Sequence, residues 1–267
     1  MRWKEVYESG AIACGEGAEF VELEHAFQTN FTTFGRTVFK LSLIIPPGKL
    51  VMPHPAYEFC NSGYHKFQHR RCANVRQGQQ YSEPDRRTWC YVGSACPDLR
   101  GGRLLLPSAP SGGGEGISWK FCQDGLDESL HDVPPRELME NATRWAVESG
   151  SMYYYNNVIN LGWLMKWAYP LLADQVWADV EPLWKIGARH RLPEAVRRAL
   201  EGGRPLVIDV QHDGHGSQVV LHGEEAWSLE VDKACPHTVY CYRCLSGCEK
   251  AASGSLPHRP AAKGDEL

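Results

Sequence analysis

The sequence predicts an α+β fold that depends on disulfide bridges. Three observations lead to this class. The N-terminal half is rich in cysteine and in loop-forming Gly, Pro and Ser, the middle repeats apolar residues at helical spacing with many tryptophans, and the C-terminal part has short runs typical of a small β-hairpin region. These differences predict a cysteine-rich module (1–126), a helical body (127–203), a small β and cysteine region (204–250) and a flexible tail (251–267).

Loops are expected to dominate the N-terminal module, with a short helix over residues 18–27 and one short strand over 37–45 that ends at Pro46-Pro47-Gly48. Five cysteines follow without a long apolar run between them, namely Cys60, Cys72, Cys90, Cys96 and Cys122. Such a segment depends on disulfides or a metal, because it cannot bury a sufficient core. Cys14 completes an even set of six, which predicts three bridges.

The middle of the chain has the apolar spacing of several helices. Asp132 and Pro134-Pro135 suit a helix start, Gly150 ends that helix, and further helices are expected over 152–172, 172–184 and 193–201. Polar residues within 152–172, among them Asn156 and Lys166, argue against a transmembrane span. In the last region, residues 206–210 and 218–221 predict a hairpin, and 238–240 a third strand.

The charge distribution indicates the kind of partner. The whole chain has 28 basic and 32 acidic residues, so it is not a generally basic protein and nucleic acid is not an expected partner. Residues 60–122 differ, with nine basic against four acidic residues, a net charge of +5. Aromatic residues interleave with arginines there, which suits an anionic ligand such as a sulfated or phosphorylated glycan. The candidate ligand-binding residues are Arg70, Arg71, Arg86, Arg87, Trp89, Tyr91 and Trp119. Alternatively, the aromatic side chains only cover the disulfides.

Two segments of this module carry a family resemblance. Thr88-Trp89-Cys90-Tyr91-Val92 and Ser118-Trp119-Lys120-Phe121-Cys122 resemble kringle and fibronectin type II modules, which share a Trp-Cys-Tyr-like turn and a closing Trp-x-aromatic-Cys. Here Cys96 and residues 97–117 lengthen a connection that is short in those families. The resemblance therefore implies an extracellular-type binding module and leaves the cysteine pairing open.

Catalytic residue types gather in the C-terminal region, where three patterns compete. His222-Gly223-Glu224 followed by Cys241-Tyr242-Arg243-Cys244 is similar to zinc deaminases, in which the His and two Cys hold zinc and the Glu moves protons. A strand that delivers Cys241 to a tight loop is similar to rhodaneses. Residues 203–210 with His215 resemble the histidine half of papain-like peptidases. The candidate catalytic residues are Asp209, His215, His222, Glu224 and Cys241.

The cysteines of the same region allow two interpretations. Cys235, Cys241, Cys244 and Cys248 form either two disulfides or a tetrahedral zinc site, because Cys-x-x-Cys is typical of both zinc and redox sites. The expectation is that the protein needs no cofactor, with zinc as the alternative.

Several signals favour the secretory pathway. They are the cysteine count, Asn-x-Thr sequons at Asn30 and Asn141, and the ending Lys263-Gly264-Asp265-Glu266-Leu267, which is close to a retrieval signal. Residues 1–5 lack the apolar run of a signal peptide, so a cytoplasmic location is the alternative. We expect a disulfide-stabilised glycoprotein, secreted or in the endoplasmic reticulum lumen, that binds an anionic ligand. The alternative is a zinc- or thiol-dependent enzyme, either a hydrolase, deaminase-like or sulfurtransferase-like. The oligomeric state stays open.

Overall fold

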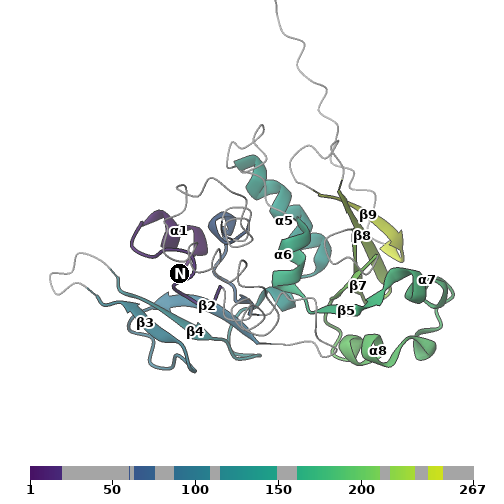
Figure 1. The fold of residues 1–267 in the computed structure, drawn as a ribbon, viewed down its shortest axis with the longest axis horizontal. Helices are drawn as coiled ribbons and strands as arrows, with labels where there is room; N and C mark the ends of the chain where they lie inside the picture. The colour runs from purple at the N-terminus through teal and green to yellow at the C-terminus, as the bar shows by residue number, and fades with distance from the viewer. Residues whose placement is uncertain are drawn as a thin grey trace, which may run out of the picture.

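The computed structural model describes residues 1–19, 60, 63–75, 87–108, 115–148, 161–210, 217–231 and 240–248. Helices and two β-sheets confirm the α+β class. The two sheets lie at opposite ends of the molecule, and helices α5 and α6 stand between them (Figure 1). Within the described residues, no helix is both long and apolar enough to cross a lipid bilayer.

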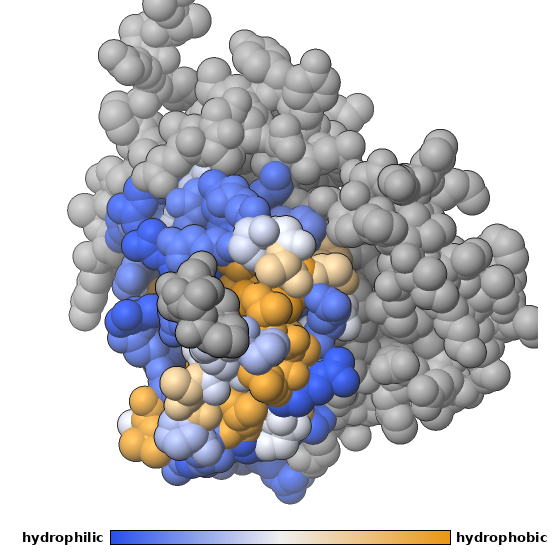
Figure 2. Space-filling view, turned by 90° about the vertical axis from the view of Figure 1, so that its left-hand side faces the viewer, coloured by the Kyte–Doolittle hydropathy of each residue, from blue (hydrophilic) through white to orange (hydrophobic). Residues whose placement is uncertain are grey.

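The first sheet is antiparallel, with the strand order β1-β2-β4-β3. Its strands are β1 (Ala73–Asn74), β2 (Thr88–Gly93), β3 (Arg103–Leu106) and β4 (Ile117–Phe121). The edge strand β3 leaves Leu104 and Leu106 exposed. Figure 2 shows apolar residues gathered on this N-terminal side of the molecule and bordered by hydrophilic ones.

Helix α1 (Trp3–Glu8) and the 3-10 helix η1 (Tyr64–Lys66) pack on this sheet. Trp3 and Val6 are buried because their spacing of three places both on the inner face of α1. Helix α5 (Pro135–Glu148) begins with a proline, whose missing N–H costs nothing in a first turn. The helix predicted to begin near Pro134-Pro135 is therefore confirmed, and its predicted end at Gly150 lies outside the described residues. Helix α6 (Leu161–Ala168) is the next described helix. The 3-10 helix η2 (Leu130–Asp132) precedes α5.

The second sheet has the order β5-β6-β7-β8-β9, and only the pair β5 and β6 is parallel. The strands are β5 (Leu171–Val176), β6 (Leu206–Asp209), β7 (Gln218–His222), β8 (Glu225–Val231) and β9 (Tyr240–Ser246). The crossover from β5 to β6 contains helix α7 (Trp177–Lys185), the 3-10 helix η4 (Arg189–Arg191) and helix α8 (Glu194–Leu200). The helix over 193–201 and the hairpin of β6 and β7 are therefore confirmed.

Some sequence predictions need correction. The helix predicted over 172–184 is wrong in its first part, because Leu171–Val176 is a strand and the helix begins at Trp177. Strand β5 is the edge strand and pairs in parallel with β6 at Leu171 and Leu172, so pairing within the sheet, which local apolar spacing does not reveal, decides its structure. The third strand starts at Tyr240, where its predicted range ended. The predicted elements at 18–27 and 37–45, and the part of 152–172 before Leu161, lie almost wholly outside the described residues.

One hydrophobic core crosses the boundary predicted near residue 126. It runs from Trp3 and Trp89 in the N-terminal part, through Leu138 and Trp167 of the helices, to Leu229 in the second sheet. A second cluster lies between the other face of the second sheet and the helices α7 and α8. The first sheet, helices α5 and α6, and one face of the second sheet therefore pack together in one core.

The disulfides are fewer in the N-terminal module than the even count predicts. The bridges in which both cysteines are among the described residues are Cys14–Cys60, Cys72–Cys122 and Cys244–Cys248. Cys90 and Cys96 are free thiols, so the predicted third bridge of the module is wrong. An even number of cysteines permits pairing but does not bring each pair within the short Cα–Cα distance that a bridge requires.

Candidate ligand-binding pocket

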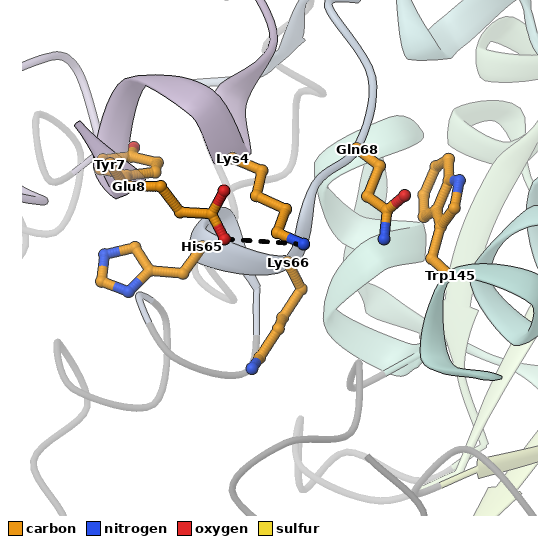
Figure 3. A pocket seen from close by; sticks show the side chains of 7 residues that line it. All are labelled: Lys4, Tyr7, Glu8, His65, Lys66, Gln68 and Trp145. Atoms are coloured by element: carbon orange, nitrogen blue, oxygen red, sulfur yellow. Dashed lines mark ion pairs between the residues drawn. The ribbon is translucent and has the colours of Figure 1, made fainter. Parts of the chain in front are cut away.

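A cavity of about 350 Å³ opens where α1, η1 and α5 meet (Figure 3). Its described lining consists of Lys4, Tyr7, Glu8, His65, Lys66, Gln68 and Trp145. Basic, acidic and aromatic side chains are thus brought to one hollow from three segments that lie far apart in the sequence. A hollow of this size suits a small molecule or one or two units of a longer ligand.

Trp3 holds α1 in place beside the pocket. Its indole Nε1 donates a hydrogen bond to the carbonyl oxygen of Arg71 at 2.9 Å. Its ring stacks on Tyr64 at a centroid distance of 5.3 Å and meets Trp89 edge-on at 4.6 Å. Because Trp3 points into the core, the cavity is lined by the neighbouring face of α1. This face carries Lys4 and, one helical turn later, Tyr7 and Glu8.

Two lysines give the pocket a positive charge. The Nζ of Lys4 lies 3.6 Å from Oε1 of Glu8. Lys66 forms no ion pair with any residue in the described part of the chain, and burial together with the neighbouring charge of Lys4 lowers the pKa of its ammonium. Burial lowers the pKa of His65 to about 4, so this ring is neutral at pH 7. The described lining therefore has a net charge of +1 at neutral pH, from two lysines and one glutamate.

Aromatic rings form the apolar part of the lining. Tyr7 lies against His65 with their ring centroids 4.6 Å apart. The hydroxyl of Tyr7 donates to the carboxylate of Glu19 at 2.6 Å, and Tyr91 donates to the same oxygen. Burial raises the pKa of Glu19. These hydrogen bonds fix the Tyr7 ring, and the half-buried Trp145 presents an indole surface from α5.

The ligand-binding residues predicted from sequence lie elsewhere. Trp89, Tyr91 and Trp119 are 0%, 1% and 7% exposed, so their rings belong to the core and offer no open face for stacking. This burial agrees with the packing interpretation of these aromatic residues. The arginines lie on the surface or close to it: Arg70 pairs with Glu128 at 3.5 Å, Arg71 is half-buried, and Arg87 is exposed over the ring of Phe121 at 5.7 Å. Arg86 lies outside the described residues.

The candidate catalytic residues do not form one site. His222 ends β7, and Gly223 and Glu224 form the two-residue hairpin turn that follows, in which Gly223 has a φ of +56°, a conformation that glycine adopts without strain. Cys241 pairs with Glu230 near the opposite end of β8, and Asp209 pairs with Gln218 at the opposite end of β7 from His222. The β8 partners of His222 and Cys241, which are Glu225 and Glu230, are five residues apart and thus separated by about 17 Å along the strand, so the His and Cys of a zinc deaminase are not brought together. His215 lies outside the described residues.

Disulfide bonds among the C-terminal cysteines bear on the zinc site that the sequence offered as an alternative. Cys244 and Cys248 are joined to each other, and Cys241 is disulfide-bonded. A disulfide sulfur is not the thiolate that binds zinc, so these three cysteines do not supply zinc ligands in this state. Cys235 lies outside the described residues.

Sequence reasoning missed the pocket residues Lys4, Tyr7, Lys66 and Trp145. One signal was present, because Trp3, Val6 and Tyr7 repeat at helical spacing and predict a short amphipathic helix. No family model, curated protein or solved structure matches this chain. The pocket is therefore interpreted from its own residues.

Proposed function

We propose that the protein is a disulfide-stabilised binding protein whose pocket between α1, η1 and α5 holds the anionic sugar unit of a glycan. The observation that carries this proposal is the position of Lys66, an ammonium group without an ion-pair partner among the described residues, in a cavity that Lys4 also lines. Burial, and after it the charge of Lys4, lowers the pKa of Lys66, and an anion bound between the two ammonium groups would stabilise the charged form of Lys66 against both effects.

The rings of Tyr7, His65 and Trp145 explain why the anion would belong to a sugar. Flat side chains match the apolar faces of a sugar ring, while an ammonium group binds a carboxylate or sulfate on its edge. Gln68 adds a donor and an acceptor for hydroxyl groups. A neutral sugar would use the rings and the amide but would leave Lys66 without an ion-pair partner among the described residues, whereas Lys4 is already paired with Glu8.

The expected affinity is modest. Each charged hydrogen bond contributes about 1.5–3 kcal/mol, and a ring contact adds about 1 kcal/mol. After the loss of translational freedom, this corresponds to a Kd in roughly the micromolar to millimolar range for one sugar unit. The cavity is open to solvent, so added salt should weaken the binding.

A titration followed by NMR tests the proposal. The probes are a glucuronate-containing disaccharide, a sulfated disaccharide and a neutral disaccharide of the same ring number. The acidic probes should shift signals of Tyr7, His65 and Trp145 in a saturable way, and the neutral one should shift them much less. Equal shifts with acidic and neutral probes would contradict the charge-based assignment.

We further propose a secretory location, which the bridges and the sequons support. Asn141 lies on α5 and is half-buried, with its side-chain oxygen accepting a hydrogen bond from Arg144. When the chain is expressed behind a leader in a eukaryotic host, glycosidase treatment should shift its gel band, and Asn141→Gln with Asn30→Gln should abolish the shift. A gel band that glycosidase treatment does not shift would remove the sequons as support for a secretory location.

A further inference from the structure

The sulfur atoms of three cysteines lie close together at the first sheet. Cys72 precedes β1, Cys90 lies in β2 and Cys122 follows β4, so neighbouring strands of one sheet position all three. Cys72 and Cys122 form a bridge, and Cys90 is a buried free thiol. The three sulfurs lie within 4.8 Å of one another.

The spacing of these sulfurs resembles that of a metal-thiolate centre. The Sγ atoms of Cys90 and Cys122 are 3.5 Å apart. In a tetrahedral zinc site with Zn–S bonds of about 2.3 Å, two sulfurs are separated by about 3.8 Å. Cys90 and Cys122 thus already stand close to the separation that a shared ion needs, and opening the bridge allows Cys72 to reach a similar separation from Cys122.

The surroundings favour a site of this kind. Cys72 and Cys90 are 1% and 5% exposed, and Cys122 is half-buried, which leaves one side for an ion to enter. Lys120 lies directly opposite Cys90 in the pairing of β2 with β4, and its ammonium is paired with Asp127. Because Asp127 offsets the charge of Lys120, this pair adds no net charge beside the cluster, and the bound divalent ion itself supplies the positive charge that favours the thiolates.

We propose that Cys72, Cys90 and Cys122 form a binding site for one thiophilic divalent ion, such as Zn²⁺, once a thiol reductant has opened the Cys72–Cys122 bridge. Two molecules of the reductant supply two electrons and two protons, which yields two cysteine thiols and one reductant disulfide. The ion then binds three thiolates, three protons are released to solvent, and water takes the fourth position. An external disulfide reverses the sequence: it accepts two electrons, the bridge forms again and the ion leaves.

A second cluster offers a useful comparison. Cys14, Cys60 and His65 also place their ligand atoms within 4.8 Å of one another. That cluster has no free thiol, because both of its cysteines are bridged to each other. Cys90 is the feature that distinguishes the first cluster, since it supplies a third sulfur without any change in its own bonding.

Cys90 and Cys96, which are the free cysteines of the described ranges, provide a matched pair of variants for the test. Cys90→Ser removes one ligand, and Cys96→Ser removes a free thiol that is not part of the three-sulfur cluster. The full-length protein is reduced with a phosphine, exchanged into metal-free buffer, and treated with iodoacetamide with or without one equivalent of Zn²⁺. Peptide mass spectrometry then reports alkylation at each cysteine, so binding by other reduced cysteines is seen separately.

Zinc should lower the alkylation of Cys72, Cys90 and Cys122 together at least tenfold, both in the wild-type protein and in Cys96→Ser. In Cys90→Ser, Cys72 and Cys122 should lose most of this protection. Cobalt in place of zinc should give a sulfur-to-metal charge-transfer band that weakens in Cys90→Ser alone. Equal protection in both variants would overturn the proposal. A reduced protein whose near-ultraviolet circular dichroism is lost and does not return with Zn²⁺ would also overturn it.

Discussion

The indole rings of Trp3 and Trp89 meet edge-on, with their centroids 4.6 Å apart and their planes at 77°. Both side chains are fully buried. This contact joins the first helix to the central strand of the first sheet and thereby places Lys4 and Tyr7 at the pocket. The stability of the N-terminal core and the shape of the pocket consequently both depend on Trp3.

Trp3→Ala should therefore lower the free energy of unfolding by about 3–5 kcal/mol, because a large buried ring leaves a cavity among aromatic neighbours. Urea unfolding followed by circular dichroism measures the change. Ile186→Ala is the control, since Ile186 is 70% exposed and its loss should cost less than about 0.5 kcal/mol. Similar losses for both variants would show that Trp3 does not anchor the core.

The shared core predicts cooperative unfolding across residue 126. Near-ultraviolet signals from the aromatic residues around Trp3 and Trp89 should disappear at the same urea concentration as the far-ultraviolet helix signal of α5 and α6. Two separate midpoints would show instead that the N-terminal part and the helices unfold independently.

Thiol mapping tests the pairing of the cysteines. Cys96 should react with iodoacetamide in the native protein, whereas Cys90 should react only after unfolding because it is buried. Cys122→Ser should cost about 2–5 kcal/mol of stability through the loss of a bridge, and Cys90→Ser should cost about 1 kcal/mol. A peptide in which Cys90 is linked to another cysteine would contradict this pairing.

Acid should destabilise the protein through the half-buried histidines His65 and His69. Burial is the first cause that lowers the pKa of His65 to about 4 and that of His69 to about 3, with the charge of Arg71 adding to the effect on His69. The unfolded chain binds more protons than the folded one between these values and the ordinary pKa of about 6.5. The two neutral histidines therefore contribute fully to the free energy of unfolding above pH 6.5, and this contribution is lost as the pH falls towards 3–4.

His69→Gln should move the acid-unfolding midpoint to lower pH, as followed by tryptophan fluorescence, because glutamine has no proton to gain. His190→Gln is the matched control, since His190 is exposed on η4. An unchanged midpoint for His69→Gln would indicate that another group controls the acid transition.

Local sequence patterns predicted part of this fold. Helices α5 and α8 and the β6–β7 hairpin were predictable because their periodicity and their end residues lie within each segment. Strand β5 was not, because its Leu172 and Val176 have a spacing that also suits a helix, and only the pairing with β6 distinguishes the two. The pocket was missed for a related reason: Lys4, Lys66 and Trp145 belong to segments that only tertiary packing brings together.

The central claim is that Lys66 binds the anion of an acidic sugar, and calorimetry on two lysine variants tests it most directly. Lys66→Gln keeps most of the side chain but removes the charge, while Lys185→Gln removes a lysine that is paired with Glu181 on α7. With a sulfated disaccharide at low salt, Lys66→Gln should raise Kd about tenfold to a hundredfold, and Lys185→Gln should leave it unchanged. Equal Kd values for wild type and Lys66→Gln, in a protein with unchanged circular dichroism, would contradict the claim.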